Sequence, residues 1–221
     1  MKVLFVEPHP DDIVLSAYFT IKKLYSTDEI YLASVSNSPD YAIRDSKRFC
    51  IHMGINFVET KMIPDIMLSN KITPQRYKSE SNPYEYQIYE YSRRYPESID
   101  NATALIADVV EQVKPDLFIT CIGIGHPMHV VTRIASDRIL GMSKNIHYFI
   151  EAPYWFRKYG ERIVNYSKLA RKSTYIPLKT EVDEKLDVFK TCYPTEVSIL
   201  RFDRDNFYTH PECIFYNPST L

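Results

Sequence analysis

Glycine is scarce in this chain: only five of its 221 residues are glycine, and no GxGxxG or Walker-type loop is present. A loop that cradles phosphate groups with its backbone amides needs closely spaced glycines. The sequence therefore argues against a glycine-rich phosphate-binding site.

Paired cysteines and long apolar runs are also missing. The cysteines are widely scattered and form no CxxC pair, so the sequence indicates no structural zinc site built from them. The apolar run at the N-terminus spans four residues and leads directly into charged ones, which indicates a strand rather than a signal peptide. No segment reaches the length needed to cross a bilayer. We expect a cytoplasmic protein with reduced thiols, those of Cys50, Cys121, Cys192 and Cys213.

The chain also lacks an excess of either charge, with 27 Lys and Arg against 28 Asp and Glu. A strongly basic surface is what attracts nucleic acid or an anionic membrane. We therefore expect neither of these partners. The sequence leaves open whether the chain forms a homo-oligomer.

What is present is an alternation of buried strands and amphipathic helices. Runs of β-branched and aromatic residues predict the strands, and apolar residues at helical spacing predict the helices. The alternation predicts an α/β fold, a Rossmann-like three-layer sandwich with a mostly parallel central sheet and helices on both faces. The predicted strands are 3–6, 29–36, 56–59, 117–121 and 147–152, and the predicted helices include 41–53, 99–113 and 181–192.

We expect one domain over residues 1–221, with an α/β core at 1–150 and a C-terminal extension at 151–221. Within the extension, the basic segment 166–177 is interpreted as a surface connection, and a mixed tail follows the last helix. Segment 70–97 carries six tyrosines among Ser, Asn and Pro residues. It is either a helix that packs an amphipathic tyrosine face, which is the favoured alternative, or an aromatic wall over a sugar- or nucleotide-sized cleft.

The most informative segment is Lys2–Ser16, with the sequence KVLFVEPHPDDIVLS. A buried strand leads into a turn that holds one imidazole and two carboxylates, those of His9, Asp11 and Asp12. In open α/β sheets, ligands bind outside the carboxyl ends of the strands. The turn is therefore predicted to supply half of a metal site.

A second strand end has similar chemistry, because strand 117–121 leads into GIGHPMH, which contains His126 and His129. His9 and Asp12 lie three residues apart across a turn, so both can point at one ion. His129 would complete a set of two imidazoles and one carboxylate. Three protein ligands with an open position are typical of catalytic zinc.

The remaining groups of the two motifs suggest roles in hydrolysis. A bound divalent ion lowers the pKa of its water to about 7. Asp11 is placed to be the general base that accepts the water proton. His126 could donate a proton to a developing oxyanion or to a leaving amine.

Other interpretations stay open. Asp11 or Asp12 could cap the amides at a helix N-terminus, and histidines three residues apart often only pack. The same ligand set also describes the facial triad of non-haem iron oxygenases, although those usually sit on antiparallel barrels. Zn²⁺ is the expected cofactor, with Fe²⁺ as the alternative in the same hydrolytic role.

HPDD directly after the first strand, with H-P-x-H after a strand of the form PDLFIT, resembles the LmbE-like or PIG-L superfamily. These proteins are zinc-dependent N-deacetylases that act largely on N-acetylglucosaminyl groups. The resemblance covers residues 1 to about 150. It implies that Asp11 is the base, that His126 assists the oxyanion or the leaving group, and that the zinc ligands are His9, Asp12 and His129.

The resemblance also implies substrate contacts. Arg44 resembles the family's substrate-contacting arginine, and Asp65 resembles an aspartate that can contact sugar hydroxyls. The alternative for both is an ordinary surface charge. We expect a small-molecule N-acetylated sugar as the substrate.

Three features depart from the family pattern. The family's first motif usually continues through a glycine-containing turn of helix, where this chain has residues 14–17, VLSA. Met128 replaces the acid of the usual H-P-D-H, which could orient His126, and Ile124 stands where some members have a tyrosine. The expected function is removal of the acetyl group from an N-acetylated amino sugar or its conjugate, with metal-bound water as nucleophile. The alternatives are a catalytically inactive sugar- or nucleotide-sugar-binding protein of the same fold, and another metal-assisted hydrolysis such as cleavage of an amino-acid conjugate.

Overall fold

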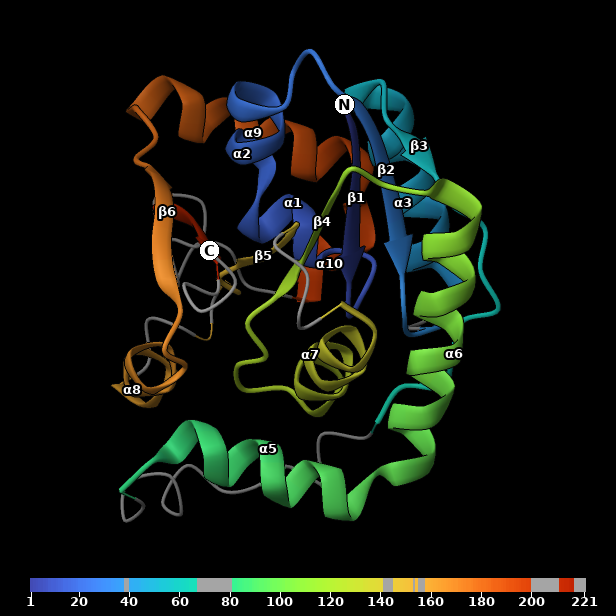
Figure 1. The fold of residues 1–221 in the computed structure, drawn as a ribbon. Coiled ribbons are helices and arrows are strands. Elements are labelled where there is room, and N and C mark those ends of the chain that lie inside the picture. The colour runs from blue at the N-terminus through green and yellow to red at the C-terminus, as the bar shows by residue number, and fades with distance from the viewer. Residues whose placement is uncertain are drawn as a thin grey trace.

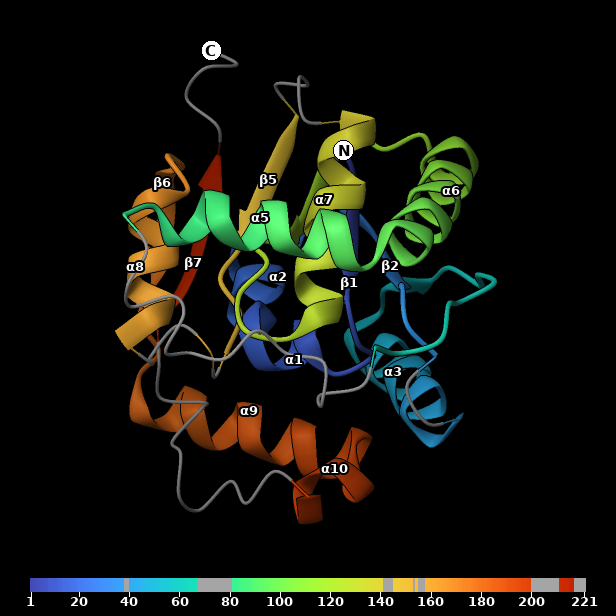
Figure 2. The ribbon, with the colours of Figure 1, turned by 90° about the horizontal axis from the view of Figure 1, so that it is seen from below.

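A computed structural model describes residues 1–37, 40–66, 81–140, 145–152, 154, 158–199 and 211–216. Seven strands of these residues form one sheet in the order β3-β2-β1-β4-β5-β7-β6 (Figures 1 and 2). The strands are β1 Lys2–Glu7, β2 Glu29–Ser34, β3 Asn56–Phe57, β4 Leu117–Cys121, β5 Ile146–Phe149, β6 Ala170–Tyr175 and β7 Glu212–Tyr216.

Most of the sheet is parallel. Strand β1 pairs in parallel with both β2 and β4, and the β2–β3 and β4–β5 pairs are parallel as well. Strand β7 runs antiparallel to both of its neighbours, β5 and β6. Every residue of β4 is buried, as expected of a central parallel strand covered on both faces. The predicted α/β sheet is therefore confirmed.

Helices cover both faces of the sheet, as predicted (Figure 2). Successive side chains of a strand point to opposite faces, so Leu4 and Val6 join one hydrophobic core while Val3 and Phe5 join the other. The first core is covered by α5 Pro83–Arg94, α6 Pro96–Val113, α7 Pro127–Leu140 and α8 Lys158–Tyr166. The second is covered by α1 Asp12–Ser16, α2 Tyr18–Leu24, α3 Asp40–Met53 and α9 Lys179–Cys192, and α10 Pro194–Ile199 contacts α3 and α9.

The predictions for the C-terminal part were wrong in three places. Segment 166–177 contains strand β6 rather than only a surface connection. Helix 181–192 is not the last helix, because α10 follows it, and the tail contains strand β7. Strand β6 lies at the edge of the sheet, where basic side chains such as Arg171 are tolerated and block further pairing. Because of these charged residues, β6 lacks the continuous apolar run by which a central strand is recognised in a sequence.

The described part of the tyrosine-rich segment is a helix that packs its tyrosines. Tyr91 of α5 is fully buried, and Tyr84, Tyr86 and Tyr95 pack against the first core. Tyr89 is 64% exposed. Residues 83–95 therefore match the packing alternative, whereas 70–80 lie outside the described residues.

Among the described helices, none combines the length and the apolar character that crossing a membrane requires.

One buried ion pair joins the C-terminal elements to the N-terminal helices. Lys185 of α9 lies 2.8 Å from Glu212 of β7, and its ammonium also donates to the carbonyl of Leu15 at 2.7 Å. The second oxygen of Glu212 accepts the backbone N–H of Thr20 at 2.8 Å. Both charged side chains are almost completely buried.

Lys185→Met should lower the free energy of unfolding by about 3–5 kcal/mol, because Glu212 remains as a buried carboxylate without its cation. Urea unfolding would measure the change. The matched control is Lys190→Met, which removes an exposed lysine from the same helix and should change stability by less than about 0.5 kcal/mol. Equal stabilities of the two variants would contradict the prediction.

Candidate metal centre

The two histidine motifs meet because β1 and β4 are neighbours in the sheet. The chain continues from β1 to β2 on one side, while β4 lies on the other side, with Val6 opposite Thr120. The strand order therefore reverses at β1 and β4, and ligands of open α/β sheets bind at such a point outside the carboxyl ends. His9 and Asp12 follow β1, and His129 lies in the first turn of α7 after β4.

The first turn of α1 is capped by Glu7 rather than by Asp11 or Asp12. The buried carboxylate of Glu7 accepts the backbone N–H of Ile13 at 3.0 Å. Asp11 stands at the N-cap position of α1 but makes no capping hydrogen bond with its side chain. Asp12 accepts the backbone N–H of His9 at 2.8 Å through Oδ2. The structure thus contradicts the helix-capping alternative for these two aspartates.

Three acceptor atoms converge at one point of this turn. Nδ1 of His9 lies 3.2 Å from Oδ2 of Asp12, and Nε2 of His129 lies 3.3 Å from that oxygen and 3.3 Å from Nδ1 of His9. The three atoms form a nearly equilateral triangle. Such a triangle has about the edge length of a tetrahedral site with ligands 2.0–2.1 Å from a zinc ion.

The electrostatics of the triangle favour positive charge. Burial acts to lower the pKa of His9, but Asp12 and Asp65 raise it to about 10. Burial acts to raise the pKa of Asp12, but His129 and His9 hold it well below its ordinary value. The donor set and its charge fit a divalent cation. His129 and Asp12 are buried while the side chain of His9 is 14% exposed, so the triangle faces solvent on the His9 side.

Asp11 lies beside the triangle in a negative environment. Burial, Asp12 and Glu196 raise its pKa to about 7. Glu196 belongs to α10, so the C-terminal part of the chain contributes a carboxylate near the first motif. A carboxyl group with a pKa close to neutrality can both accept and return a proton at neutral pH.

His126 is placed as a hydrogen-bond donor next to His9. Its ring packs edge to face against the ring of His9, with centroids 4.5 Å apart. Its Nδ1 accepts the backbone N–H of Met128 at 3.2 Å. In a neutral imidazole the other nitrogen then carries the proton. His126 can therefore donate through Nε2 without a carboxylate partner at position 128.

Asp65 contacts His9, which the sequence did not predict. Its Oδ1 lies 3.2 Å from Nε2 of His9, and its side chain is 35% exposed. His9, Asp65 and His126 form a second group of close ligand atoms. His9 could bind an ion in each group only as an imidazolate, with no proton on either ring nitrogen. A carboxylate that accepts the outer N–H of a metal-binding histidine is a simpler account.

Arg44 is not brought to the cluster. It lies on α3 with its side chain 64% exposed and approaches the buried carboxylate of Asp45 at 3.9 Å. Among the described residues it forms no hydrogen bond or ion pair with the other predicted site residues. Its substrate contact stays a prediction.

Two residues that follow β5 were missed. Glu151 is fully buried behind His129, and the ring of Tyr154 meets that of His129 edge to face at 5.1 Å. A Cβ on Gly125, whose φ is +82°, would lie 2.5 Å from the Tyr154 ring, so this loop requires glycine there. The only sequence signal for Glu151 and Tyr154 as site residues was their position just after a predicted strand.

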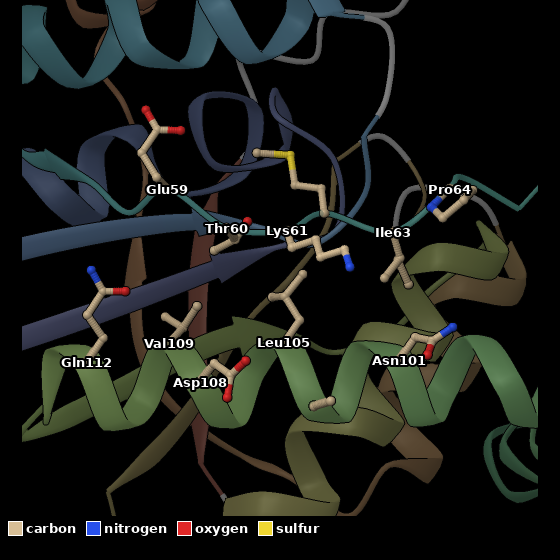
Figure 3. Close-up of a pocket in the computed structure, with 12 residues that line it drawn as sticks. Glu59, Thr60, Lys61, Ile63, Pro64, Asn101, Leu105, Asp108, Val109 and Gln112 are labelled. Carbon is tan, nitrogen blue, oxygen red and sulfur yellow. The ribbon is translucent and has the colours of Figure 1, made fainter.

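A groove of about 480 Å³ lies outside this cluster, between α6 and segment 59–64 (Figure 3). Leu105 and Val109 of α6 lie across it from residues 60–63, and Asp108 and Gln112 add polar groups. None of the three converging ligands lines the groove. Its volume is therefore not evidence for the chemistry of the cluster.

Comparison with known proteins gives the fold. No family model and no curated protein matches the sequence. A solved deacetylase from the biosynthesis pathway of teicoplanin superposes with a TM-score of 0.63 at 15% identity, covering 97% of each chain. The chain has the fold of LmbE-like deacetylases. A deacetylase of the A40926 pseudoaglycone (TM-score 0.60, 16% identity, 97% of this chain and 96% of that one) and a conserved protein of Thermus thermophilus (TM-score 0.54, 12% identity, 99% and 95%) share it.

The predicted resemblance to LmbE-like deacetylases is confirmed in the fold. The likeness extends beyond the residues that suggested it, because the superposition with the teicoplanin deacetylase covers nearly the whole chain rather than only its first 150 residues. Both the α/β core and the C-terminal strands are therefore part of the shared architecture.

Elemental analysis of the purified protein should find about one zinc or iron ion per chain, and His129→Ala should lose it, because one corner of the triangle is removed. His52→Ala is the matched control, since His52 is an exposed histidine at the end of α3. Equal metal contents in the two variants would contradict a site that joins the two motifs.

Proposed function

We propose that this protein is a metal-dependent deacetylase that removes the acetyl group from an N-acetylated amino sugar or its conjugate. The observation that carries the proposal is the triangle of His9, Asp12 and His129 at the carboxyl ends of β1 and β4. The solved structures of similar fold include deacetylases of the teicoplanin pathway and of the A40926 pseudoaglycone. Their chemistry supports this reaction class for the present chain.

His9, Asp12 and His129 are the proposed ligands of one divalent cation, zinc or alternatively ferrous iron. Such a cation would lower the pKa of a water molecule and polarise the amide carbonyl. The three ligands leave positions open on the solvent-facing His9 side, where the acetamide group of a substrate would enter.

Asp11 is the proposed general base. It accepts the proton of the attacking water and returns it to the amine as the C–N bond breaks. Its pKa of about 7 suits both steps at neutral pH. His126 donates the proton of Nε2 as a hydrogen bond to the developing oxyanion, and this requires no positive charge on the imidazole.

A catalytically inactive sugar- or nucleotide-sugar-binding protein remains the second candidate. The buried side chain of Met128 belongs to the first core and offers no acceptor to His126. The neutral tautomer of His126 weakens this alternative, because a donor survives the replacement. Cleavage of another acylated amine, such as an amino-acid conjugate, would use the same residues. Assays of amine release with a panel of acetylated sugars and acylated amines would separate the three.

Asp11→Asn should lower the rate of amine release by a factor of about 10²–10⁴ while the metal content stays unchanged, because Asp11 is not a ligand. Measuring both quantities on one preparation tests the role. Asp108→Asn, in α6 and away from the triangle, serves as the control. Full activity of Asp11→Asn would refute the mechanism.

Asp65 is proposed to orient His9 as well as to contact substrate hydroxyls. Asp65→Ala should therefore weaken metal binding by about tenfold, in addition to raising KM. Glu59→Ala removes a more exposed carboxylate from the same segment and should change neither. A higher KM with unchanged metal affinity would leave Asp65 as a substrate contact alone.

We also propose that residues 1–221 act as one domain. Strands β6 and β7, which come from beyond residue 150, extend the same sheet as β1 to β5. Arg44 as a substrate contact and a cytoplasmic location stay predictions from the sequence.

A further inference from the structure

We propose that Glu151 is a positioning residue of the metal centre. One oxygen of its carboxylate holds the imidazole of His129 with Nδ1–H turned away from the ion, and the same oxygen holds the loop that carries His126. This inference rests on the metal-dependent function proposed above.

Glu151 is a fixed negative charge inside the protein. Its side chain is fully buried, and Oε1 accepts the backbone N–H groups of Gly123 at 2.6 Å and of Ile124 at 2.7 Å. Oε2 accepts the backbone N–H of Ile122 at 3.2 Å. A buried carboxylate persists only when such donors replace water. The loop after β4 thus supplies the donors that keep this charge in place.

The charge lies behind the proposed metal ligand. Oε1 of Glu151 is 3.4 Å from Nδ1 of His129, slightly longer than an ordinary hydrogen bond. Within the part of the chain that the structure describes, this buried nitrogen has no hydrogen-bond partner, so Oε1 of Glu151 is the acceptor that a proton on it would meet. The opposite nitrogen, Nε2, faces Asp12 and His9. A proton on Nδ1 next to the carboxylate leaves the lone pair of Nε2 directed at the ion.

The same oxygen also determines where His126 lies. The backbone N–H of His126 donates to the carbonyl of Ile124 at 3.0 Å, and the N–H of Ile124 donates to Glu151. The positions of His129 and His126 therefore both depend on the same buried oxygen. This shared contact would set the distance between an ion bound by His129 and the proposed oxyanion donor, His126.

Glu151→Gln is the most direct test. A glutamine keeps the shape and can still accept the amides of Gly123 and Ile124, but it carries no charge. The zinc affinity of the purified full-length apo-protein, measured by competition with a chromophoric chelator, should fall by about 10–100-fold.

Glu90→Gln is the matched control. Glu90 is also a buried glutamate, but it lies on α5, and its partners are the guanidinium groups of Arg93 and Arg94 rather than an imidazole. Its zinc affinity should stay within about twofold of the wild type. Equal zinc affinities of Glu151→Gln and the wild type would overturn the positioning role, whereas a wild type that binds no zinc would remove the proposed function and this inference together.

A second measurement uses the wild type alone and stands even if Glu151→Gln does not fold. Nitrogen-15 NMR of the zinc-loaded protein should place the proton of His129 on Nδ1 and the ion on Nε2. The Nδ1 proton should also resonate downfield, as expected of a proton hydrogen-bonded to a carboxylate, and a purely structural role of Glu151 in the loop does not require that hydrogen bond. The opposite assignment, with the ion on Nδ1, would overturn the proposal.

Discussion

The parallel pairing of β1 with β4 is the constraint on which the centre depends. His9 and His129 are separated by 120 residues along the chain, yet their ring nitrogens lie 3.3 Å apart. Neither motif contains the complete ligand set. The register of Val3 with Leu117 and of Val6 with Thr120 brings the two strand ends level. A one-residue slip would exchange the faces of the strand and mix the two hydrophobic cores.

The cluster also depends on two buried glutamates that accept backbone N–H groups of the turns after β1 and β4. Glu7 accepts the backbone N–H of Ile13 in the first turn of α1, which leaves the side chain of Asp12 available to the triangle and that of Asp11 beside it. Glu151 satisfies three amides after β4. Both glutamates accept their hydrogen bonds from the protein itself, so the two turns that carry the ligands are held in place before a cation arrives. A centre preorganised in this way requires little rearrangement of the chain on binding.

The sequence was informative where local pattern and sheet topology coincide. The strand before HPDD and the strand before HPMH are short apolar runs, and parallel strands share one carboxyl edge, so the convergence of His9, Asp12 and His129 could be anticipated. Glu151 could not, because its partners are backbone amides of Ile122, Gly123 and Ile124, and amides carry no sequence signal.

Tertiary contacts explain the other differences. Glu196 approaches Asp11 only because α10 packs against α3. Arg171 gives β6 the polar character of a loop, although its partner strand β7 is largely buried. Asp65 was expected to contact substrate hydroxyls, and its contact with His9 depends on how the segment after β3 pairs, through Ile63, with Ser36 after β2.

The position of β7 has a consequence for how the chain acquires its fold. This strand comes last in the order of the described strands, yet it lies between β5 and β6. Until β7 is in place, β5 exposes a row of unpaired backbone groups and β6 has no partner, and open edges of this kind recruit strands of other molecules. A chain shortened before residue 212 would thus keep both histidine motifs and still leave β5 as an unpaired edge strand, open to pairing with another molecule.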